Sequence, residues 1–451
     1  MDAVFLLSKF LKTKTNRFSY AGTKDTRGVT TQLVTAKQIS AKQLASLNPR
    51  LRGIHLGDFQ YVKEQINLGQ LKGNHFQVVL RDIDAPDATV DAVMQSVKSK
   101  GFINYYGMQR FGTGTVATSE IGKAILLGNW SGAVDLILGE RVADYEEVKA
   151  ARRCWTQTKD ARKAGDLFPQ KCTIERQLLQ GLKSNKVQGK ADGYDWVSAF
   201  RSISRNMRLM YVHAYQSLLW NKLVSARIKQ HGLEVVAGDL ILADKDDARA
   251  SCHPDDEQKI RVLVVTAADV AAGTFKITDV VMPLPGYAVV LPSNELGDYL
   301  RQLMTEDGLA GYDFRHKEKD YTLSGAYRHM CVLPSDVSWK VHDYTDEKKS
   351  LVLSDADFLE GKTELTPQVA AEGKVARRAL ALAFTLPPST YATMLVREVI
   401  KMPTDSNYQT SLNPKGKGGQ TSTAHNDGGG GAAAAAAAVA PQPEPEKAQA
   451  N

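Results

Sequence analysis

The segment FSYAGTKDTRGVTTQ, residues 18–32, carries the most specific information about fold and chemistry in this chain of 451 residues. Gly22 and Gly28 bracket a Thr-Lys-Asp-Thr-Arg core, and β-branched residues follow. Glycines on both sides allow the backbone to approach a ligand closely. The segment therefore predicts a ligand-binding loop that leads into a strand at residues 29–36.

Asp25, in the middle of this loop, is the only carboxylate between Asp2 and Asp58. The neighbouring Lys24 and Arg27 would keep it ionised, because nearby positive charges lower the pKa of a carboxyl group. An ionised carboxylate on a glycine loop is what a nucleophile or a general base requires. The alternative is a turn aspartate that pairs with its own neighbours, and this segment alone favours neither interpretation.

A second segment, GFINYYGMQRFGT at residues 101–113, interleaves aromatic side chains with amides and an arginine. These are Phe102, Asn104, Tyr105, Tyr106, Gln109, Arg110 and Phe111. Aromatic rings can stack on an unstacked base while amide groups read its edges. The alternative is a core strand with inward-facing aromatic residues, which periodicity alone slightly favours.

Six blocks in order along the chain resemble the TruD family of RNA pseudouridine synthases, in its eukaryotic branch: AGTKDTRGVTTQ, LKGNHFQVVLRDI, NYYGMQRFGT, YVHAYQSLLWNKLVSARI, DVVMPLPGY and LPPSTYATMLVREVI. The resemblance runs from about residue 3 to 402. It implies an α+β catalytic domain with a mostly antiparallel central sheet, interrupted by an inserted α+β TRUD domain. The predicted parts are residues 1–150 (catalytic, first part), 151–322 (insert), 323–402 (catalytic, second part) and 403–451 (disordered tail).

The resemblance also implies an isomerase that converts uridine to pseudouridine in RNA, chiefly tRNA, with small nuclear RNA and messenger RNA as further substrates. No metal or organic cofactor is expected. The family's catalytic aspartate falls on Asp25, and its N-x-F motif falls on Asn104 and Tyr106, with Tyr where bacterial members have Phe. By similarity Tyr106 stacks on the uracil and Asn104 braces the catalytic loop.

Four further residues are expected to contact phosphate, base or loop: Lys24, Arg27, Arg110 and Phe111. One departure from the family pattern concerns the N-terminus, because family members carry strands and a basic residue upstream of the first helix, and this chain starts at that helix. The N-terminal strands are apparently missing, through a truncated gene model or a real loss. The rival hypothesis is therefore a non-catalytic RNA-binding protein that retains the fold.

Composition agrees with an RNA-directed protein inside the cell. The net charge is +7, and residues 1–50 hold nine Lys or Arg and only two acids, although scattered lysines such as Lys37 and Lys42 are better explained as a solvated helix face. Neither a secretory signal nor a membrane-spanning run is present. There is no nucleotide-binding P-loop and no zinc motif. We expect a monomer in the nucleus, the cytoplasm or both.

Local patterns predict the main elements. Apolar alternation and β-branched runs predict strands at residues 29–36, 75–83, 261–267, 350–355 and 379–387. Helical spacing of apolar residues predicts helices at 1–12, 86–101 and 208–228. The mixture lacks regular βαβ alternation and so indicates mainly antiparallel sheets.

Overall fold

The computed structural model describes residues 2–25, 28–112, 116–141, 144–185, 193–243, 249, 251–255, 260–365 and 377–402. It forms two compact units: unit 1 takes its described residues from 1–101 and 333–392, and unit 2 from 102–332 and 393–451. Every strand pair in the described residues is antiparallel, so the predicted α+β class is confirmed. The predicted tail, 403–451, lies outside the described residues.

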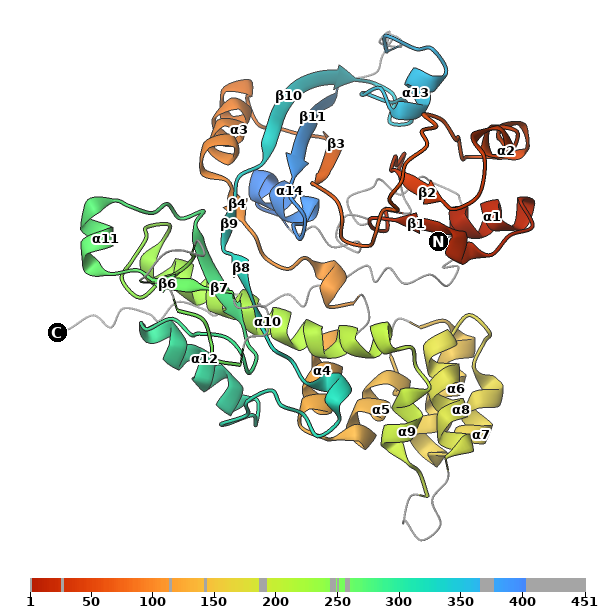
Figure 1. Ribbon diagram of the computed structural model, residues 1–451, viewed down its shortest axis with the longest axis vertical. Coiled ribbons are helices and arrows are strands. Elements are labelled where there is room, and N and C mark those ends of the chain that lie inside the picture. The colour runs from red at the N-terminus through yellow and green to blue at the C-terminus, as the bar shows by residue number, and fades with distance from the viewer. Residues whose placement is uncertain are drawn as a thin grey trace, which may run out of the picture. The chain divides into compact units, whose positions relative to one another are not determined.

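Unit 1 is built on a three-stranded sheet in the order β10-β11-β3. Its elements are α1 (Asp2–Phe10), β1 (Phe18–Tyr20), β2 (Val34–Ala36), α2 (Ala41–Ala45), β3 (Asn74–Arg81), α3 (Asp87–Lys100), β10 (Ser335–Tyr344), α13 (Asp355–Leu359) and β11 (Arg377–Leu386). Figure 1 shows β11 between its two neighbours. The sheet thus joins segments from both ends of the sequence.

The central strand β11 is buried on both faces over part of its length. Leu380 and Leu382 are buried as the alternating pattern predicts, but Ala379 and Ala381 on the other face are buried as well. Small alanines let the chain pack closely where a central strand is covered on both sides. The predicted strand at residues 379–387 is therefore confirmed.

A smaller core cluster lies beneath the N-terminal helix. Leu7 of α1 is buried together with Phe18 and Leu47, and Val4, Phe10 and Leu11 pack against them. This is the apolar face that helical spacing predicts, so the helix predicted at residues 1–12 is confirmed over Asp2–Phe10.

Two strand predictions in unit 1 need correction. The strand predicted at residues 29–36 covers only Val34–Ala36, because residues 28–33 run as loop and the Thr31 hydroxyl donates to the Asp355 carboxylate. Residues 350–355 form no strand. There Leu351 fills a cluster with Tyr344 and Ala379, and Ser354 caps α13, so this apolar run anchors a loop instead.

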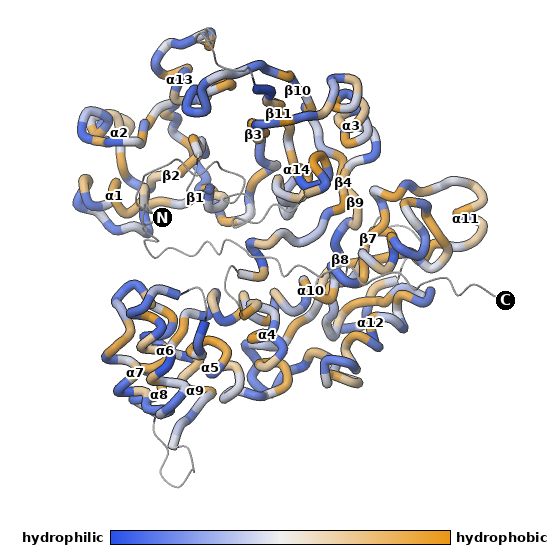
Figure 2. Tube along the Cα trace, turned by 180° about the vertical axis from the view of Figure 1, so that it is seen from behind, coloured by the Kyte–Doolittle hydropathy of each residue, from blue (hydrophilic) through white to orange (hydrophobic). Residues whose placement is uncertain are grey.

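Unit 2 combines a helical bundle with a four-stranded sheet in the order β6-β5-β7-β8 and a short β4–β9 pair. Its elements are β4 (Phe102–Ile103), α4 (Thr118–Leu126), α5 (Trp130–Leu138), α6 (Glu146–Thr158), α7 (Ala161–Leu167), α8 (Thr173–Ser184), α9 (Trp196–Arg201), α10 (Arg205–His231), β5 (Leu240–Leu242), β6 (Val262–Val264), α11 (Ala267–Ala272), β7 (Val280–Leu284), α12 (Glu295–Glu306), β8 (Ala326–His329), β9 (Cys331–Val332) and α14 (Ala392–Ile400). Figure 2 shows apolar and polar residues interleaved along α5 to α9.

The long helix α10 organises unit 2, because it packs against α4, β7 and α12. Gly122 of α4 lies so close that a Cβ there would sit 2.1 Å from the Tyr211 carbonyl oxygen of α10. At the other end, Arg227 forms a fully buried ion pair with Asp239, with 2.8 Å between Nη2 and Oδ2. The predicted helix at residues 208–228 is thus confirmed and extended.

Three further observations concern the described residues. None of their helices is both long and apolar enough to cross a membrane. Within the same residues, no group of three or more His, Cys, Asp or Glu is placed to hold a metal ion. None of the four cysteines, all of which lie in the described residues, forms a disulfide.

Candidate active site

Asp25 lies in unit 1, on the loop between β1 and β2. The two strands pair from Phe18 opposite Ala36 to Tyr20 opposite Val34, so the loop leaves and re-enters a short hairpin-like ladder. The Asp25 side chain is exposed, and none of the residues that the structure describes forms an ion pair or hydrogen bond with its carboxylate. No described residue bonds to its oxygens, so a ligand can reach them.

Lys24 ties this loop to the central sheet. Its ammonium donates a hydrogen bond of 2.8 Å to Oδ1 of Asn74, the first residue of β3. Just before Asn74, Gly73 passes so close to Leu386 that a Cβ would lie 2.4 Å from the Leu386 carbonyl oxygen. The Asn74 anchor is therefore set by close backbone packing at the β3–β11 edge. Arg27, the other predicted cation, lies outside the described residues.

Asn104 lies in unit 2 and is almost completely buried. Its backbone N–H donates to the Met330 carbonyl at 2.9 Å, and its side-chain amide donates to the His329 carbonyl at 3.1 Å. Arg328 completes the brace, because Nη2 donates to Asn104 Oδ1 at 2.7 Å and Nε donates to the Asn104 carbonyl at 3.0 Å. Asn104 thus joins the segment after β4 to strand β8.

Tyr106 is fixed by its backbone and by its ring. Asn221 of α10 accepts from the Tyr106 N–H at 2.9 Å and donates to the Tyr106 carbonyl at 3.1 Å. The ring is 9% exposed and meets Trp220 edge-on, with 5.5 Å between ring centroids. The Arg328 guanidinium lies 4.2 Å from the Tyr106 ring centroid, so a cation covers this aromatic ring.

Arg110 is the last residue of a short 3-10 helix that follows Tyr106, Met108–Arg110, and Phe111 caps its C-terminus. The Arg110 guanidinium lies 5.4 Å from the Tyr106 ring centroid, and its buried Nε has no hydrogen-bond partner among the described residues. Phe111 is half-buried, and its carbonyl accepts from the Thr118 N–H that begins α4. Of the candidate site residues, the structure thus brings Asn104, Tyr106 and Arg110 together in unit 2.

Sequence reasoning missed Arg328, Trp220 and Asn221, which hold these residues in place. Asn221 and Trp220 sit within a block that indicated only a helix, and a polar Asn beside buried positions of that helix was the one available signal. Arg328 had no comparable signal, because its contacts with Asn104 span 224 residues of sequence.

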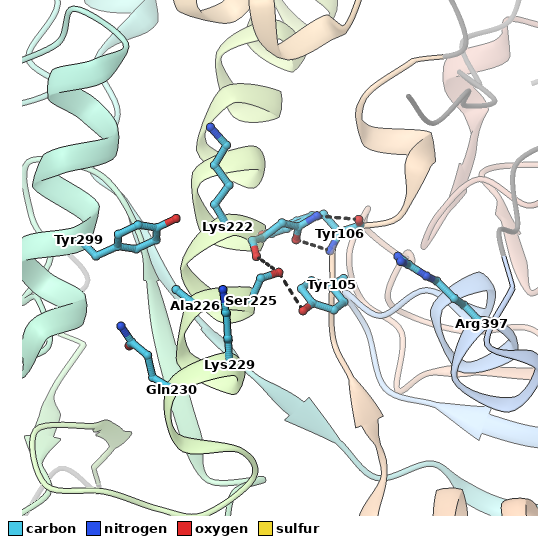
Figure 3. A pocket seen from close by; sticks show the side chains of 10 residues that line it. Tyr105, Tyr106, Lys222, Ser225, Ala226, Lys229, Gln230, Tyr299 and Arg397 are labelled. Atoms are coloured by element: carbon cyan, nitrogen blue, oxygen red, sulfur yellow. Dashed lines mark hydrogen bonds between the residues drawn. The ribbon is translucent and has the colours of Figure 1, made fainter. Parts of the chain in front are cut away.

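A cavity of about 750 Å³ opens beside Tyr106 in unit 2 (Figure 3). It is lined by Tyr105, Tyr106, Asn221, Lys222, Ser225, Ala226, Lys229, Gln230, Tyr299 and Arg397. Figure 3 shows the Tyr105 hydroxyl directed at Ser225 of α10, and the two hydroxyl oxygens are 3.0 Å apart. The lining contains cations, aromatic rings and hydroxyls but neither a carboxylate nor a histidine, so it is suited to binding rather than to proton transfer.

Cys331, the cysteine near Asn104, is not a candidate nucleophile. Cys331 of β9 pairs with Ile103 of β4, and burial raises the pKa of its thiol to about 11. The thiol is therefore protonated and inert at neutral pH. Among the described residues of the Asp25 loop and of segment 101–112, the candidate for covalent chemistry is therefore the exposed carboxylate of Asp25.

We expect Asn221→Ala to destabilise the fold by about 1–3 kcal/mol, because it leaves the N–H and carbonyl of Tyr106 without their partners. Urea denaturation measures the change. Gln230→Ala is the matched control, because Gln230 is exposed on the same helix and should shift the midpoint little. Equal midpoints for the two variants would contradict the bracing role of Asn221.

Comparison with known proteins finds relatives over most of the chain. The family model for tRNA pseudouridine synthase D (TruD) matches residues 1–399. The chain is 46% identical to the human protein named Pseudouridylate synthase 7 homolog over 414 residues, which are 92% of this chain and 58% of that protein. It is 35% identical to the Schizosaccharomyces pombe protein named Multisubstrate pseudouridine synthase 7, over 92% of this chain and 62% of that protein.

The fold has a solved relative as well. A crystal structure from Methanosarcina mazei, of a protein named as a tRNA pseudouridine synthase D, aligns with a TM-score of 0.61 and 26% identity. The alignment covers 89% of this chain and 85% of that chain. By contrast, the chain spans only about three fifths of the length of the human and yeast relatives.

Proposed function

Because this chain belongs to the TruD family of tRNA pseudouridine synthases, we propose that it isomerises uridine to pseudouridine in RNA. The observation that carries the proposal is Asp25, an exposed carboxylate in the matching A-G-T-K-D block, on a loop anchored to the sheet through Lys24 and Asn74. One ionised carboxylate is sufficient for the reaction.

In the proposed reaction the Asp25 carboxylate attacks C1′ of the ribose, or removes the proton at C2′, and the bond between N1 of uracil and C1′ breaks. The released uracil turns over and its C5 forms a bond to C1′. In the first route this displaces the Asp25 carboxylate and breaks its ester bond to C1′, and in the second route the carboxylate returns the proton to C2′. The C5 proton then leaves to solvent, and N1 takes up a proton. Substrate and product are isomers, so no oxidant or reductant is required.

The target base has to leave the stack to reach such a site. We propose that Tyr106 stacks on the extruded uracil. The family resemblance predicts that Asn104 braces the catalytic loop, but its hydrogen-bond partners among the described residues are Met330, His329 and Arg328. We therefore propose that it braces the segment that carries Tyr106. Lys24, Arg27 and Arg110 are proposed to contact phosphate groups or the catalytic loop, and Phe111 to support binding of the base. The buried hydrogen bond from Arg328 to Asn104 supports the bracing role of Asn104, and the Arg328 guanidinium over the Tyr106 ring holds that ring in place.

We propose tRNA as the principal substrate, with small nuclear RNA and messenger RNA as further substrates. The name of the yeast relative, Multisubstrate pseudouridine synthase 7, supports more than one RNA for a protein of this kind. We further propose a monomer that acts in the nucleus, the cytoplasm or both. Light scattering and imaging of the tagged protein test these two points.

The deciding experiment uses a transcribed tRNA that carries tritium at C5 of its uridines. Because the reaction expels the C5 hydrogen, we expect tritium release at the rate of pseudouridine formation. Binding of the same tRNA without any tritium release, by a folded protein and across several substrate RNAs, would instead support the rival RNA-binding hypothesis.

For Tyr106 we expect Tyr106→Phe to keep most activity and Tyr106→Ala to lose on the order of 1–3 kcal/mol of transition-state stabilisation, the range for one stack of a base on an aromatic ring. Single-turnover tritium release measures both. The exposed Tyr145→Ala in the same unit is the control, and unfolding midpoints separate lost stacking from lost packing against Trp220. Equal, severe loss in both Tyr106 variants would assign the hydroxyl a proton-transfer role.

A further inference from the structure

The exposed face of α10 presents a row of polar side chains to the cavity beside Tyr106. Lys222, Ser225, Ala226 and Lys229 are three or four residues apart, which places them on one face of a helix. Lys222, Ser225 and Lys229 are exposed, so solvent or a ligand can reach them. The cavity of about 750 Å³ falls within the roughly 300–1,000 Å³ range of small-ligand sites.

The cavity is electropositive. Among the described residues Lys222, Lys229 and Arg397 form no ion pair, although cations of the adjoining helices do: Arg301 pairs with Asp298 in α12, and Lys401 pairs with Glu398 in α14. Three unneutralised cations around one hollow repel each other and attract an anion. Their ligand is therefore expected to carry more than one negative charge.

Two aromatic rings line the cavity and add selectivity for an aromatic base to the selectivity for negative charge. The Tyr105 hydroxyl bonds to Ser225, whose own hydroxyl donates to the Asn221 carbonyl at 2.9 Å, so the Tyr105 side chain is held in place. Tyr299 lies on α12, and Figure 3 shows its ring on one side of the α10 residues and Arg397 on the other. Tyrosine rings beside unpaired cations are suited to a base and its phosphates.

We propose that this cavity binds the single-stranded nucleotides that flank the target uridine in the RNA. Lys222, Lys229 and Arg397 contact phosphates, and Tyr105 or Tyr299 stacks on an unpaired base. The position follows from Tyr106, which lines the same cavity and is proposed to stack on the target base. The identity of the ligand as RNA rests on the proposed function, and the location of its binding site rests on the cavity.

The test compares the double variant Lys222→Gln/Lys229→Gln with Lys276→Gln/Lys317→Gln. The control removes the same charge from exposed lysines of the same unit that do not line the cavity. Kd for a transcribed tRNA is measured across salt concentrations. If both cavity lysines contact phosphate, the slope of log K against log salt becomes shallower by about 1.4–1.8, while the control leaves it nearly unchanged.

A stacking variant gives a second measurement. Tyr299→Ala is expected to weaken binding of a short single-stranded RNA about 5- to 150-fold, and Tyr299→Phe should retain affinity. Poly-glutamate of matched charge serves as a competitor. Competition as strong as that of unlabelled RNA would overturn the assignment to nucleotides and favour an acidic protein segment.

Different experimental results would contradict the cavity proposal and the proposed function. Wild-type protein that releases tritium, with a cavity double variant that matches its control in Kd and salt slope, overturns the cavity proposal alone. Wild-type protein that binds tRNA through the cavity lysines but releases no tritium overturns the isomerase proposal and leaves the cavity as an RNA site.

Discussion

Replacement of Asp25 by asparagine is expected to lower the single-turnover rate of tritium release by at least about a thousandfold, because it removes the proposed nucleophile while keeping the shape of the side chain. The fold should tolerate the change, since Asp25 is exposed and forms no ion pair with the described residues. Affinity for tRNA should stay within about twofold of wild type, because no cation is lost.

Asp58→Asn provides the matched control for Asp25→Asn. Asp58 is likewise an exposed carboxylate in unit 1, so the control removes the same charge at another place. Its tritium release should equal that of wild type. An Asp25→Asn protein that still converts uridine at more than a small fraction of the wild-type rate would eliminate Asp25 as the nucleophile.

The second large effect is expected at Arg328. Arg328→Met should reduce the free energy of unfolding by about 3–5 kcal/mol, because the Asn104 carbonyl and Oδ1 lose their buried donors and Tyr106 loses the cation over its ring. Tritium release should fall with it, even where the variant is fully folded, because Tyr106 is no longer held. Urea denaturation and the tritium assay at a permissive temperature measure the two effects separately.

Arg328→Lys is the informative partner variant. An ammonium keeps the charge but cannot present the planar fork that meets both Asn104 acceptors, so an intermediate loss is expected. Arg153→Met is the control, because Arg153 is exposed and its Glu140 partner is 3.8 Å away. If Arg328→Met were as stable and as active as this control, the brace between Asn104 and strand β8 would have no functional importance.

Local patterns predicted the elements whose burial depends on near neighbours in sequence. The alternation in β11 and the apolar spacing in α3 and α10 all correspond to observed elements. Residues 350–355 show the limit of such patterns, because Leu351 is buried by loop packing against Tyr344 rather than by a strand partner. A short apolar run has the same appearance in both situations.

The candidate site was predictable only in part. The family resemblance identified Asp25, Asn104 and Tyr106, whereas Arg328 and Asn221 emerged only from the folded structure. Both act through hydrogen bonds to residues far away in the chain, and no periodicity records such contacts. The cavity cations Lys222 and Lys229 were likewise visible in the sequence only as ordinary surface lysines of a helix.

The contact between Asn104 and Arg328 has a consequence for biosynthesis. The two residues are separated by 224 positions, so at roughly 5–20 residues per second the ribosome releases Asn104 about 11–45 seconds before Arg328. During this interval the nascent chain contains the Asn104–Tyr106 segment without the guanidinium that braces it. The contact between Asn104 and Arg328 therefore cannot form until translation has continued past strand β8.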